Sequence, residues 1–353
     1  MNRILQGNVF DKLKEIESES IQCVVTSPPY WGLRDYGTAS WIGGDENCNH
    51  YRDNHVTNSC TTGHSTSQKS GGVSDSIYKK ECKKCGAIRK DEQLGLEETP
   101  EEYVDNMVKV FREIRRVLKD GGTVWLNLGD SYSSGGRETT INQSVRGEQD
   151  YGVTRPPVCK GIKPKDLVGI PWRVAFALQA DGWYLRQDII WHKPNPMPES
   201  VIDRCTKSHE YIFLLTKSAR YFYDADAIAE KTLTMDNSDR DRDLTKLNNT
   251  NGQPRHGGFQ HNQYQTRNKR SVWTINTKPY KDAHFAVFPD RIPELCIKAG
   301  SSEGDVVLDP FFGSGTTGYV AQRLGRKWLG IELNPKYIKI AEKRFQQQEL
   351  FTV

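Results

Sequence analysis

The sequence predicts an α/β fold with a doubly wound, mainly parallel sheet that carries two polar insertions. Apolar, strand-like runs alternate with helix-like periodicity, which is typical of a sheet covered by helices on both faces. Two of these runs, one near each end of the chain, lead into turns rich in proline or glycine at residues 26–31 and 309–318. Because ligands of such sheets bind outside the carboxyl ends of the strands, we expect a site where these turns meet.

The elements follow from hydrophobic periodicity and from start and stop residues. A helical period begins after Pro100-Glu101-Glu102, a favourable helix start, and we expect Gly121-Gly122 to end that helix. Short apolar runs predict strands at residues 21–25, 123–128, 183–191, 211–216, 305–308 and 328–331. Helices are expected at residues 103–118, 174–178, 292–299, 317–324 and 335–345.

Composition and charge exclude several classes of protein. The 353 residues are 36% hydrophobic and 27% charged, which excludes collagen-like and wholly disordered chains. The net charge of +4 is too small to identify a partner. No apolar run approaches the roughly 20 residues that cross a bilayer, and the first residues lack the apolar core of a signal peptide. We therefore expect a soluble, cytoplasmic protein whose eight cysteines are thiols or metal ligands.

Two polar stretches interrupt the alternation of strands and helices. Residues 38–99 are rich in Gly, Ser, Thr and Asn, and residues 226–277 are polar and irregular. Structureless loops of this length are uncommon inside compact domains, so each is expected to have a role of its own. The remaining residues, 1–37, 100–225 and 278–353, are predicted to form the core.

The turn near the C-terminus has the pattern of a nucleoside site. Glycines at 313 and 315 allow close backbone approach, and the following helix start offers free N–H groups. Glu332, 23 positions beyond Asp309 (332 − 309), ends the next strand, where Rossmann-like sites hold ribose hydroxyls. Asp309 would repel phosphate but suits a cationic amino-acid group, which favours S-adenosylmethionine. The alternative is a purely structural turn.

The turn near the N-terminus is rigid and presents hydrogen-bonding groups. Pro28 and Pro29 fix the backbone after the strand, so that Ser27 offers one small polar side chain and Pro28 a free carbonyl. Two aromatic rings, Tyr30 and Trp31, follow. The alternative is a proline-rich strand exit with both rings packed in the core.

Together the two motifs resemble those of the DNA amino-methyltransferases, in the order of the β class. The similarity covers residues 1–37, about 100–225 and 278–347. It includes Asn127-Leu128-Gly129-Asp130, Trp191-His192-Lys193-Pro194-Asn195-Pro196 and His284-Phe285-Ala286-Val287-Phe288-Pro289. The resemblance implies a permuted S-adenosylmethionine methyltransferase fold that acts on double-stranded DNA with a flipped target base. It also implies a prokaryotic or phage-encoded enzyme that acts at the nucleoid, with a restriction endonuclease as a candidate partner.

The resemblance also implies roles for individual residues. The catalytic motif corresponds to Ser27, Pro28, Pro29 and Tyr30, whose first two members would accept the two N–H bonds of the base amine. Cofactor contacts are expected from Asn8, Phe285, Phe288, Asp309, Phe311, Gly313, Gly315, Thr316, Thr317 and Glu332. One position departs from the family, because Gly7-Asn8 stands where members commonly have Gly-Asp.

Two amines are candidates for methylation, N4 of cytosine and N6 of adenine. Ser27 stands where adenine-modifying relatives often have Asp, which favours cytosine N4 over adenine N6. Methylation of cytosine carbon 5 would need a cysteine nucleophile, typically in a Pro-Cys pair, and the chain contains none. Two further alternatives are an RNA methyltransferase and an inactive, zinc-containing DNA-binding module.

Four residues of the first insertion have the spacing of a zinc site. Cys82 and Cys85 form Cys-x-x-Cys-Gly, and Cys48 with His50 supplies a second pair. Further candidates are His55, Cys60 and His64. We predict structural zinc, because this insertion otherwise lacks a core; the alternative is a chance pair of thiols.

A basic stretch overlaps the second insertion. Residues 244–281 contain seven Lys or Arg, ten Asn or Gln and no Asp or Glu. Basic side chains neutralise phosphates, and amide side chains read base edges, so this stretch is expected to contact DNA. The resemblance implies that residues 226–277 form the target-recognition region. The DNA-binding candidates are Arg255, Arg267, Lys269 and Arg270. The alternative is a solvated loop.

Overall fold

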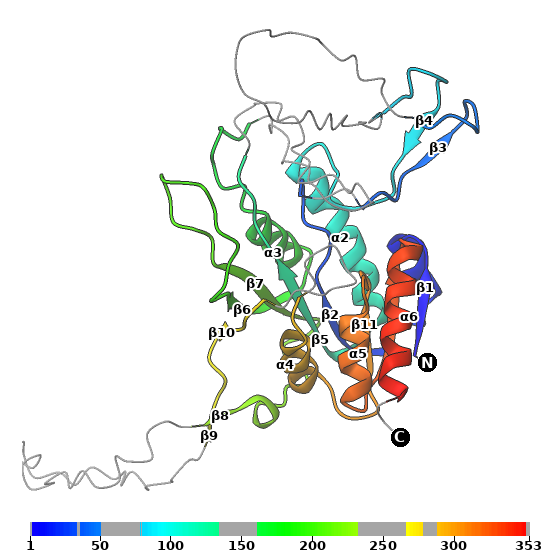
Figure 1. The fold of residues 1–353 in the computed structure, drawn as a ribbon. Coiled ribbons are helices and arrows are strands. Elements are labelled where there is room, and N and C mark those ends of the chain that lie inside the picture. The colour runs from blue at the N-terminus through cyan, green and yellow to red at the C-terminus, as the bar shows by residue number, and fades with distance from the viewer. Residues whose placement is uncertain are drawn as a thin grey trace, which may run out of the picture.

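An eight-stranded sheet forms the centre of the molecule in the computed structural model, which describes residues 2–33, 36–50, 78, 80–133, 161–231, 266–277 and 288–350. In spatial order its strands are β1 (Arg3–Gln6), β12 (Lys327–Glu332), β11 (Val306–Asp309), β2 (Ile21–Thr26), β5 (Leu118–Leu128), β7 (His209–Thr216), β6 (Tyr184–His192) and β10 (Val272–Thr274). β7 runs antiparallel to both neighbours, and every other pairing in this sheet is parallel. The predicted mainly parallel α/β fold is therefore confirmed (Figure 1).

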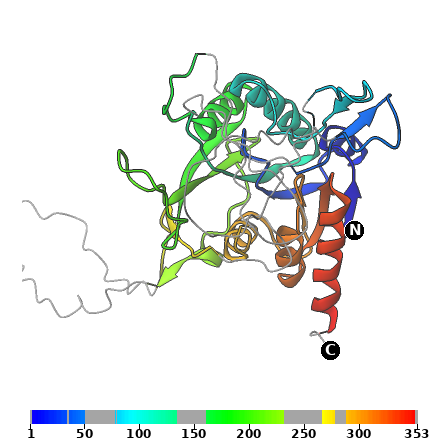
Figure 2. The ribbon, with the colours of Figure 1, turned by 45° about the horizontal axis from the view of Figure 1, so that its top comes forward.

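Helices cover both faces of this sheet, as Figure 2 shows. α1 (Val9–Lys12), α2 (Pro100–Val117) and α3 (Ile170–Ala180) pack on one face, around one hydrophobic core. α4 (Arg291–Gly300), α5 (Thr316–Arg323) and α6 (Pro335–Leu350) pack on the other face. None of the helices in the described part of the chain has the length and apolar character needed to cross a membrane.

α2 shows how the sequence sets its own boundaries. Thr99 and Glu102 form a capping box, in which each side chain accepts from the backbone N–H of the other residue. The helix ends at Val117, and Gly121-Gly122 lie inside β5, so the expectation that these glycines end the helix is wrong. A Cβ on Gly122 would lie 2.6 Å from Cγ of Leu118, so glycine at this position leaves room for the Leu118 side chain.

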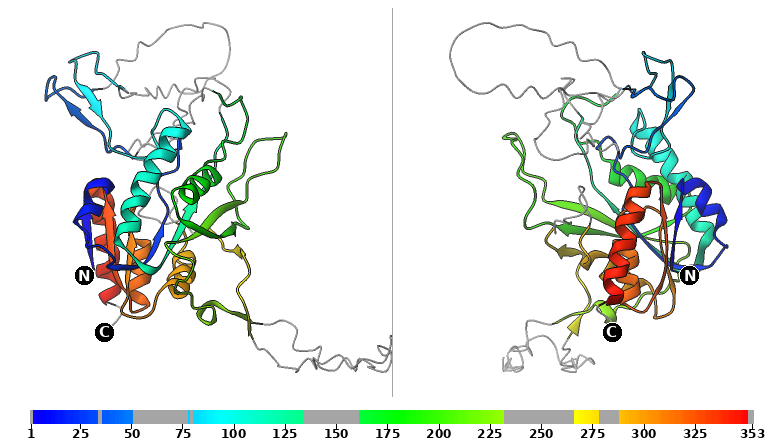
Figure 3. Two further views of the ribbon diagram at one scale, coloured as in Figure 1. Left: turned by 180° about the vertical axis from the view of Figure 1, so that it is seen from behind. Right: turned by 45° about the vertical axis from the view of Figure 1, so that its right-hand side comes forward.

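The first and last parts of the chain form one edge of the sheet. β1 pairs in parallel with β12, and the N–H of Trp328 donates to Oδ1 of Asn2 at 3.0 Å. Figure 3 shows β1 beside α6 in both views. β1 was not predicted from the sequence. It has only four residues, all half-buried or exposed, and so few residues show no clear alternation of apolar and polar side chains.

Short strands organise the described parts of the two insertions. In the first, β3 (Ser40–Ile42) and β4 (Ile88–Lys90) form an antiparallel pair, and the N–H of Gly32 donates to the carbonyl of Gly95 at 2.8 Å where the insertion meets the core. In the second, β8 (Glu230–Lys231) pairs with β9 (Thr266–Arg267), whereas β10 is the edge strand of the central sheet. The range 226–277 thus contributes a strand to the core.

Candidate active site

The two motifs from opposite ends of the chain meet at the carboxyl edge of the sheet. β2 and β11 are parallel neighbours, with Val24 opposite Leu308. At their ends, Oγ1 of Thr26 donates to Oδ1 of Asp309 at 2.7 Å, a bond that joins residues 283 positions apart. The predicted juxtaposition of these strands is confirmed.

Asp309 connects three elements at this point. Its side chain is buried and accepts hydrogen bonds from Thr26 of β2, from Thr317 of α5 at 2.7 Å, and from the N–H of Phe311 at 3.0 Å. Burial raises the pKa of Asp309 to about 7, against the opposing effect of these hydrogen bonds. Both carboxyl oxygens are engaged within the protein, so Asp309 holds the strand ends together.

The glycine turn between β11 and α5 folds over the end of β12. Gly313 and Gly315 have φ of +52° and +79°, values at which glycine is favoured. The N–H groups of Gly313 and Asn334 each donate to the carboxylate of Glu332 at 2.7 Å. Burial raises the pKa of Glu332, while these backbone N–H groups oppose that shift. The glycines and the acid predicted to act together therefore lie in direct contact.

Two features indicate that this turn has room for a ligand. Apart from the chain neighbours of Gly313, no atom of the described residues lies within 4 Å of the position where its Cβ would stand. Oγ of Ser314 is buried and has no hydrogen-bond partner among the described residues. Thr316, at the start of α5, is buried and accepts from Arg344 at 2.9 Å.

The remaining cofactor candidates lie in different surroundings. Asn8 caps α1 by accepting from the N–H of Phe10 at 2.9 Å, next to Gly7, whose N–H donates to the carbonyl of Glu332 at 3.0 Å. Phe311 is partly buried against the core that holds α2, and Phe288 against the core that holds α4. Phe285 lies outside the described residues.

The Ser-Pro-Pro-Tyr turn is held by hydrogen bonds from three directions. Oγ of Ser27 lies 3.3 Å from the hydroxyl of Tyr30 and donates to it, and that hydroxyl in turn donates to Oε2 of Glu210 at 2.6 Å. The carbonyl of Pro29 accepts from Tyr103 at 2.9 Å. Burial and the adjacent Glu210 raise the pKa of Tyr30 well above its usual range. Tyr30 therefore remains a neutral donor.

The two aromatic residues of the turn differ in exposure. Trp31 is buried in the core, as the alternative interpretation of the turn had it, and its Nε1 donates to the carbonyl of Glu97 at 3.1 Å. Tyr30 is partly exposed and lies against the end of β5, where a Cβ on Gly129 would stand 2.6 Å from the Tyr30 ring. Glycine at 129 thus makes room for this ring.

Glu210 is a site residue that sequence reasoning missed. Besides Tyr30, it pairs with Lys193 and accepts from Nδ2 of Asn127 at 2.9 Å. Oδ1 of Asn127 is buried and has no partner among the described residues. A carboxylate beside an apolar strand-like run was the available signal. It was not decisive, because the antiparallel direction of β7, which brings Glu210 to the carboxyl edge of the other strands, is not visible in the sequence.

The four predicted metal ligands come together in the first insertion. The candidate ligand atoms of Cys48, His50, Cys82 and Cys85 all lie within 4.8 Å of one another. Two of the separations are 3.7 Å, between the sulfurs of Cys48 and Cys82, and 3.6 Å, between the sulfur of Cys85 and Nδ1 of His50. A tetrahedral zinc ion implies about 3.8 and 3.6 Å for such pairs. The geometry therefore fits a four-coordinate metal; the further candidates His55, Cys60 and His64 lie outside the described residues.

The basic candidates of the second insertion surround one acid. Arg267, Lys269 and Arg270 contact the carboxylate of Glu230 at 3.4, 2.9 and 2.9 Å. Lys269 foremost, together with Arg270, lowers the pKa of Glu230 to about 2 against the opposing effect of burial. The cations of residues 244–281, a stretch without Asp or Glu, thus pair with Glu230 from outside that stretch. The group of three cations and one carboxylate keeps a net positive charge. Arg255 lies outside the described residues.

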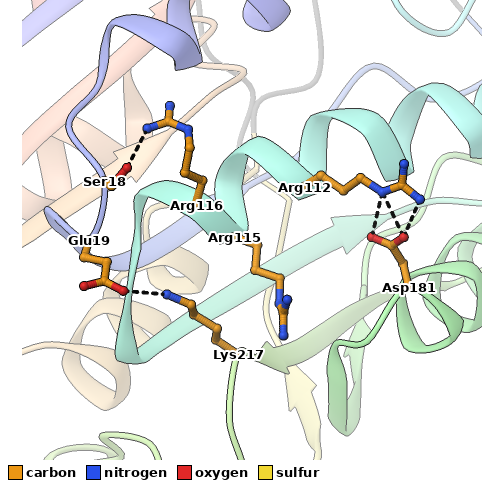
Figure 4. A pocket seen from close by; sticks show the side chains of 7 residues that line it. All are labelled: Ser18, Glu19, Arg112, Arg115, Arg116, Asp181 and Lys217. Atoms are coloured by element: carbon orange, nitrogen blue, oxygen red, sulfur yellow. Dashed lines mark hydrogen bonds and ion pairs between the residues drawn. The ribbon is translucent and has the colours of Figure 1, made fainter.

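A separate pocket of about 570 Å³ lies away from this site, beside the last turns of α2 (Figure 4). Its lining comes from before β2, from α2, from after α3 and from after β7, which places it at the opposite edge of the sheet. Arg112 pairs with Asp181 and Lys217 with Glu19, so most of its charges are already compensated. The lining residues are Ser18, Glu19, Arg112, Arg115, Arg116, Asp181 and Lys217.

Comparison with known proteins gives consistent matches over nearly the whole chain. The N6_N4_Mtase family profile, described as DNA methylase, matches residues 21–343. The type II methyltransferase M.SmaI of Serratia marcescens is 43% identical over 342 residues, which cover 97% of this chain and 90% of that protein. M.Cfr9I of Citrobacter freundii is 41% identical, and the match covers 98% of this chain and 88% of that protein.

Solved structures share the fold at lower identity. PvuII DNA methyltransferase, which is cytosine-N4-specific, aligns with a TM-score of 0.56 at 18% identity, covering 98% of this chain and 86% of that one. A proposed DNA modification methylase from Thermus thermophilus, in complex with S-adenosyl-L-methionine, aligns with a TM-score of 0.51 at 22% identity, covering 98% and 94% of the two chains.

Proposed function

This chain belongs to the family of N6/N4 DNA methylases, and from that premise we propose that it transfers a methyl group from S-adenosylmethionine to the N4 amine of cytosine in DNA. The observation that carries the choice of cytosine is Ser27. It presents a neutral hydroxyl, tied to Tyr30, where adenine-modifying relatives often have a carboxylate. Similarity to a cytosine-N4-specific structure at 18% identity concerns the fold, so the choice of base rests on this residue.

The glycine turn fits the proposed methyl donor. Among the described residues, it offers open space at Gly313 and a Ser314 hydroxyl without a partner. It also offers the carboxylate of Glu332, whose oxygens each use one acceptor position within the protein. We assign the ribose to Glu332 and the surrounding turn. When bound, S-adenosylmethionine supplies an electrophilic methyl group on a positively charged sulfur.

The residues around Tyr30 would prepare the base amine for attack. The nitrogen of an exocyclic amine is a poor nucleophile, because its lone pair is delocalised into the ring. Acceptors at Ser27 and the carbonyl of Pro28 would draw its two hydrogens and direct the lone pair, so that catalysis depends on positioning and electrostatics. The ring of Tyr30 would stack on the flipped base, and Glu210 fixes that ring through its hydroxyl.

The insertions complete the proposal. We assign a structural zinc ion to Cys48, His50, Cys82 and Cys85. We assign phosphate contacts to Arg267, Lys269 and Arg270, which surround Glu230. The second insertion would contribute to target recognition, and a restriction endonuclease of the same specificity would be the partner enzyme. A methylated duplex with the target base flipped out is the expected product complex.

Nucleoside analysis tests the proposal directly. DNA from cells that express the protein would be digested to nucleosides and examined by mass spectrometry beside DNA from cells that express Ser27→Ala. We expect N4-methylcytosine in the first sample only. N6-methyladenine alone would contradict the cytosine assignment and keep the enzyme class, whereas 5-methylcytosine would contradict the mechanism.

A further inference from the structure

The loop between β6 and β7, residues 194–207, has an unusual combination of a fixed base and a bare apolar tip. Its ends are closed by a hydrogen bond of 2.7 Å from the N–H of Lys193 to the carbonyl of Ser208. Met197 is 86% exposed and Ile202 is fully exposed. Apolar side chains this open bury little surface in the folded chain and are available to a partner.

The backbone of this loop is held in one shape. Pro194, Pro196 and Pro198 each fix a backbone dihedral angle on the way to the tip. Asn195 accepts from the N–H of Thr277 at 3.0 Å, which ties the loop to the segment that follows β10. Presenting the tip to a partner therefore costs little conformational entropy.

Cations brace the second half of the loop. The guanidinium of Arg204 lies 3.9 Å from the centre of the Tyr132 ring, and Lys165 pairs with Asp203 at 2.6 Å. Lys207 donates to the carbonyl of Asp130 at 2.9 Å. Arg204 also pairs with Glu199 of the same loop, so these cations hold the loop in shape and the exposed apolar side chains are what it offers to a partner.

The base of the loop adjoins the catalytic turn. Lys193 pairs with Glu210, and Glu210 accepts the hydrogen bond of Tyr30. Figure 1 shows the loop on the same edge of the sheet as the strands β3 and β4. A base held at Tyr30 would leave its gap in the duplex beside this loop.

We propose that Met197 and Ile202 form a wedge that enters the base stack of duplex DNA next to the flipped target base. Apolar side chains inserted between base steps stabilise an opened duplex by replacing lost stacking. The inference rests on the proposed action on a base in duplex DNA, and adds the residues that keep that base out of the helix.

The experiment compares paired and pre-opened substrates. The recognition site would first be mapped by sequencing plasmid DNA methylated in expressing cells, and duplexes carrying that site would be made with the target base paired or opposite an abasic position. The variant Met197→Ser/Ile202→Ser would be compared with Met197→Leu/Ile202→Leu, which keeps the apolar bulk. Phe176→Ala, on α3, is the control for loss of an exposed apolar side chain.

We expect the serine variant to lose about tenfold or more in turnover on the paired duplex, which corresponds to about 1.4 kcal/mol, and to recover near wild-type turnover on the abasic duplex. The leucine variant and the control should behave like wild type on both. Equal losses on both duplexes, or no loss on either, would overturn the wedge while wild-type methylation upholds the proposed function. If wild type methylates neither duplex nor plasmid DNA, both inferences fail.

Discussion

Single side chains at the carboxyl edge divide into those that shape the site and those that face the substrate. Asp309 has both carboxyl oxygens engaged by the protein, and each oxygen of Glu332 accepts one N–H and keeps a further acceptor position. Oδ1 of Asn127 and Oγ of Ser314 are buried without a partner among the described residues. Ser27 and Tyr30 are linked to each other in the same region. Substitutions at these positions should therefore separate assembly, cofactor binding and turnover.

Ser27→Ala should lose most turnover and keep near-normal affinity for S-adenosylmethionine, because the lost hydroxyl would face the base amine. Glu332→Gln should do the reverse, since its carboxylate would hold the ribose while the amide oxygen still accepts one N–H of the turn. Calorimetry for the cofactor and a methyl-transfer assay give the two readouts. Equal loss of cofactor binding in both variants would contradict this division of roles.

Asp309 should make the protein less stable as pH rises through mildly acidic values. Its folded pKa, raised to about 7, exceeds the unfolded value near 3.8, so the folded state holds its proton more tightly. Stability is thus lost between about pH 4 and pH 7 and then levels off. Asp309→Asn, which cannot ionise, should show a flatter dependence in urea unfolding across that range; an unchanged slope would contradict it.

Elements differ in how far their sequence reveals them. The period of α2 and the apolar run of β2 are strong local patterns, and the structure has both. β10 is three residues long in a polar stretch, and its place beside β6 depends on tertiary pairing that no local pattern encodes. The clustering of the four candidate ligands in the first insertion was predictable because metal chemistry restricts residue type and spacing.

The first insertion should depend on its metal. Cys82 is fully buried, and Cys82→Ser should release one zinc ion per chain and increase proteolysis within residues 38–99. Cys205, an exposed cysteine outside the cluster, is the matched control, and Cys205→Ser should retain zinc. Elemental analysis of protein purified without chelator checks this, and a metal-free wild type would contradict it.

Two cations on Glu230 should respond differently to substitution. Arg270 has a side chain 66% exposed, whereas that of Lys269 is only 18% exposed. Arg270→Ala should weaken DNA binding and lower the salt dependence by about one unit of slope, as for one lost phosphate contact. Lys269→Ala should leave that slope closer to wild type. Binding measured across salt concentrations distinguishes them, and unchanged affinity in both would place DNA elsewhere.

At the scale of the whole molecule, the two motifs lie far apart along the chain but side by side in the sheet. The meeting of the two end motifs was predictable, because both follow strands of one parallel sheet. The strand β1 was not, although it lies outside β12 and supports the strand that ends in Glu332. The edge of the sheet beside Glu332 is therefore built by residues 3–6.

Deleting residues 1–6 should weaken cofactor binding more than it affects the rest of the fold. Without β1, the hydrogen-bonding groups of β12 at that edge are unpaired, and Glu332 loses the support of the neighbouring strand. We expect a lower melting temperature that addition of S-adenosylmethionine restores less than in wild type. A truncated protein with wild-type affinity for the cofactor would contradict this expectation.

The hydrogen bond between Thr26 and Asp309 also has a consequence for biosynthesis. Because it spans 283 positions, a ribosome completes the Ser-Pro-Pro-Tyr turn long before it synthesises the neighbouring strand β11. Contacts this distant in sequence form late and slow folding, since the loop between them must close first. Methylating activity should consequently appear only after β11 has been synthesised, and a chain stalled before β11 would remain inactive toward DNA.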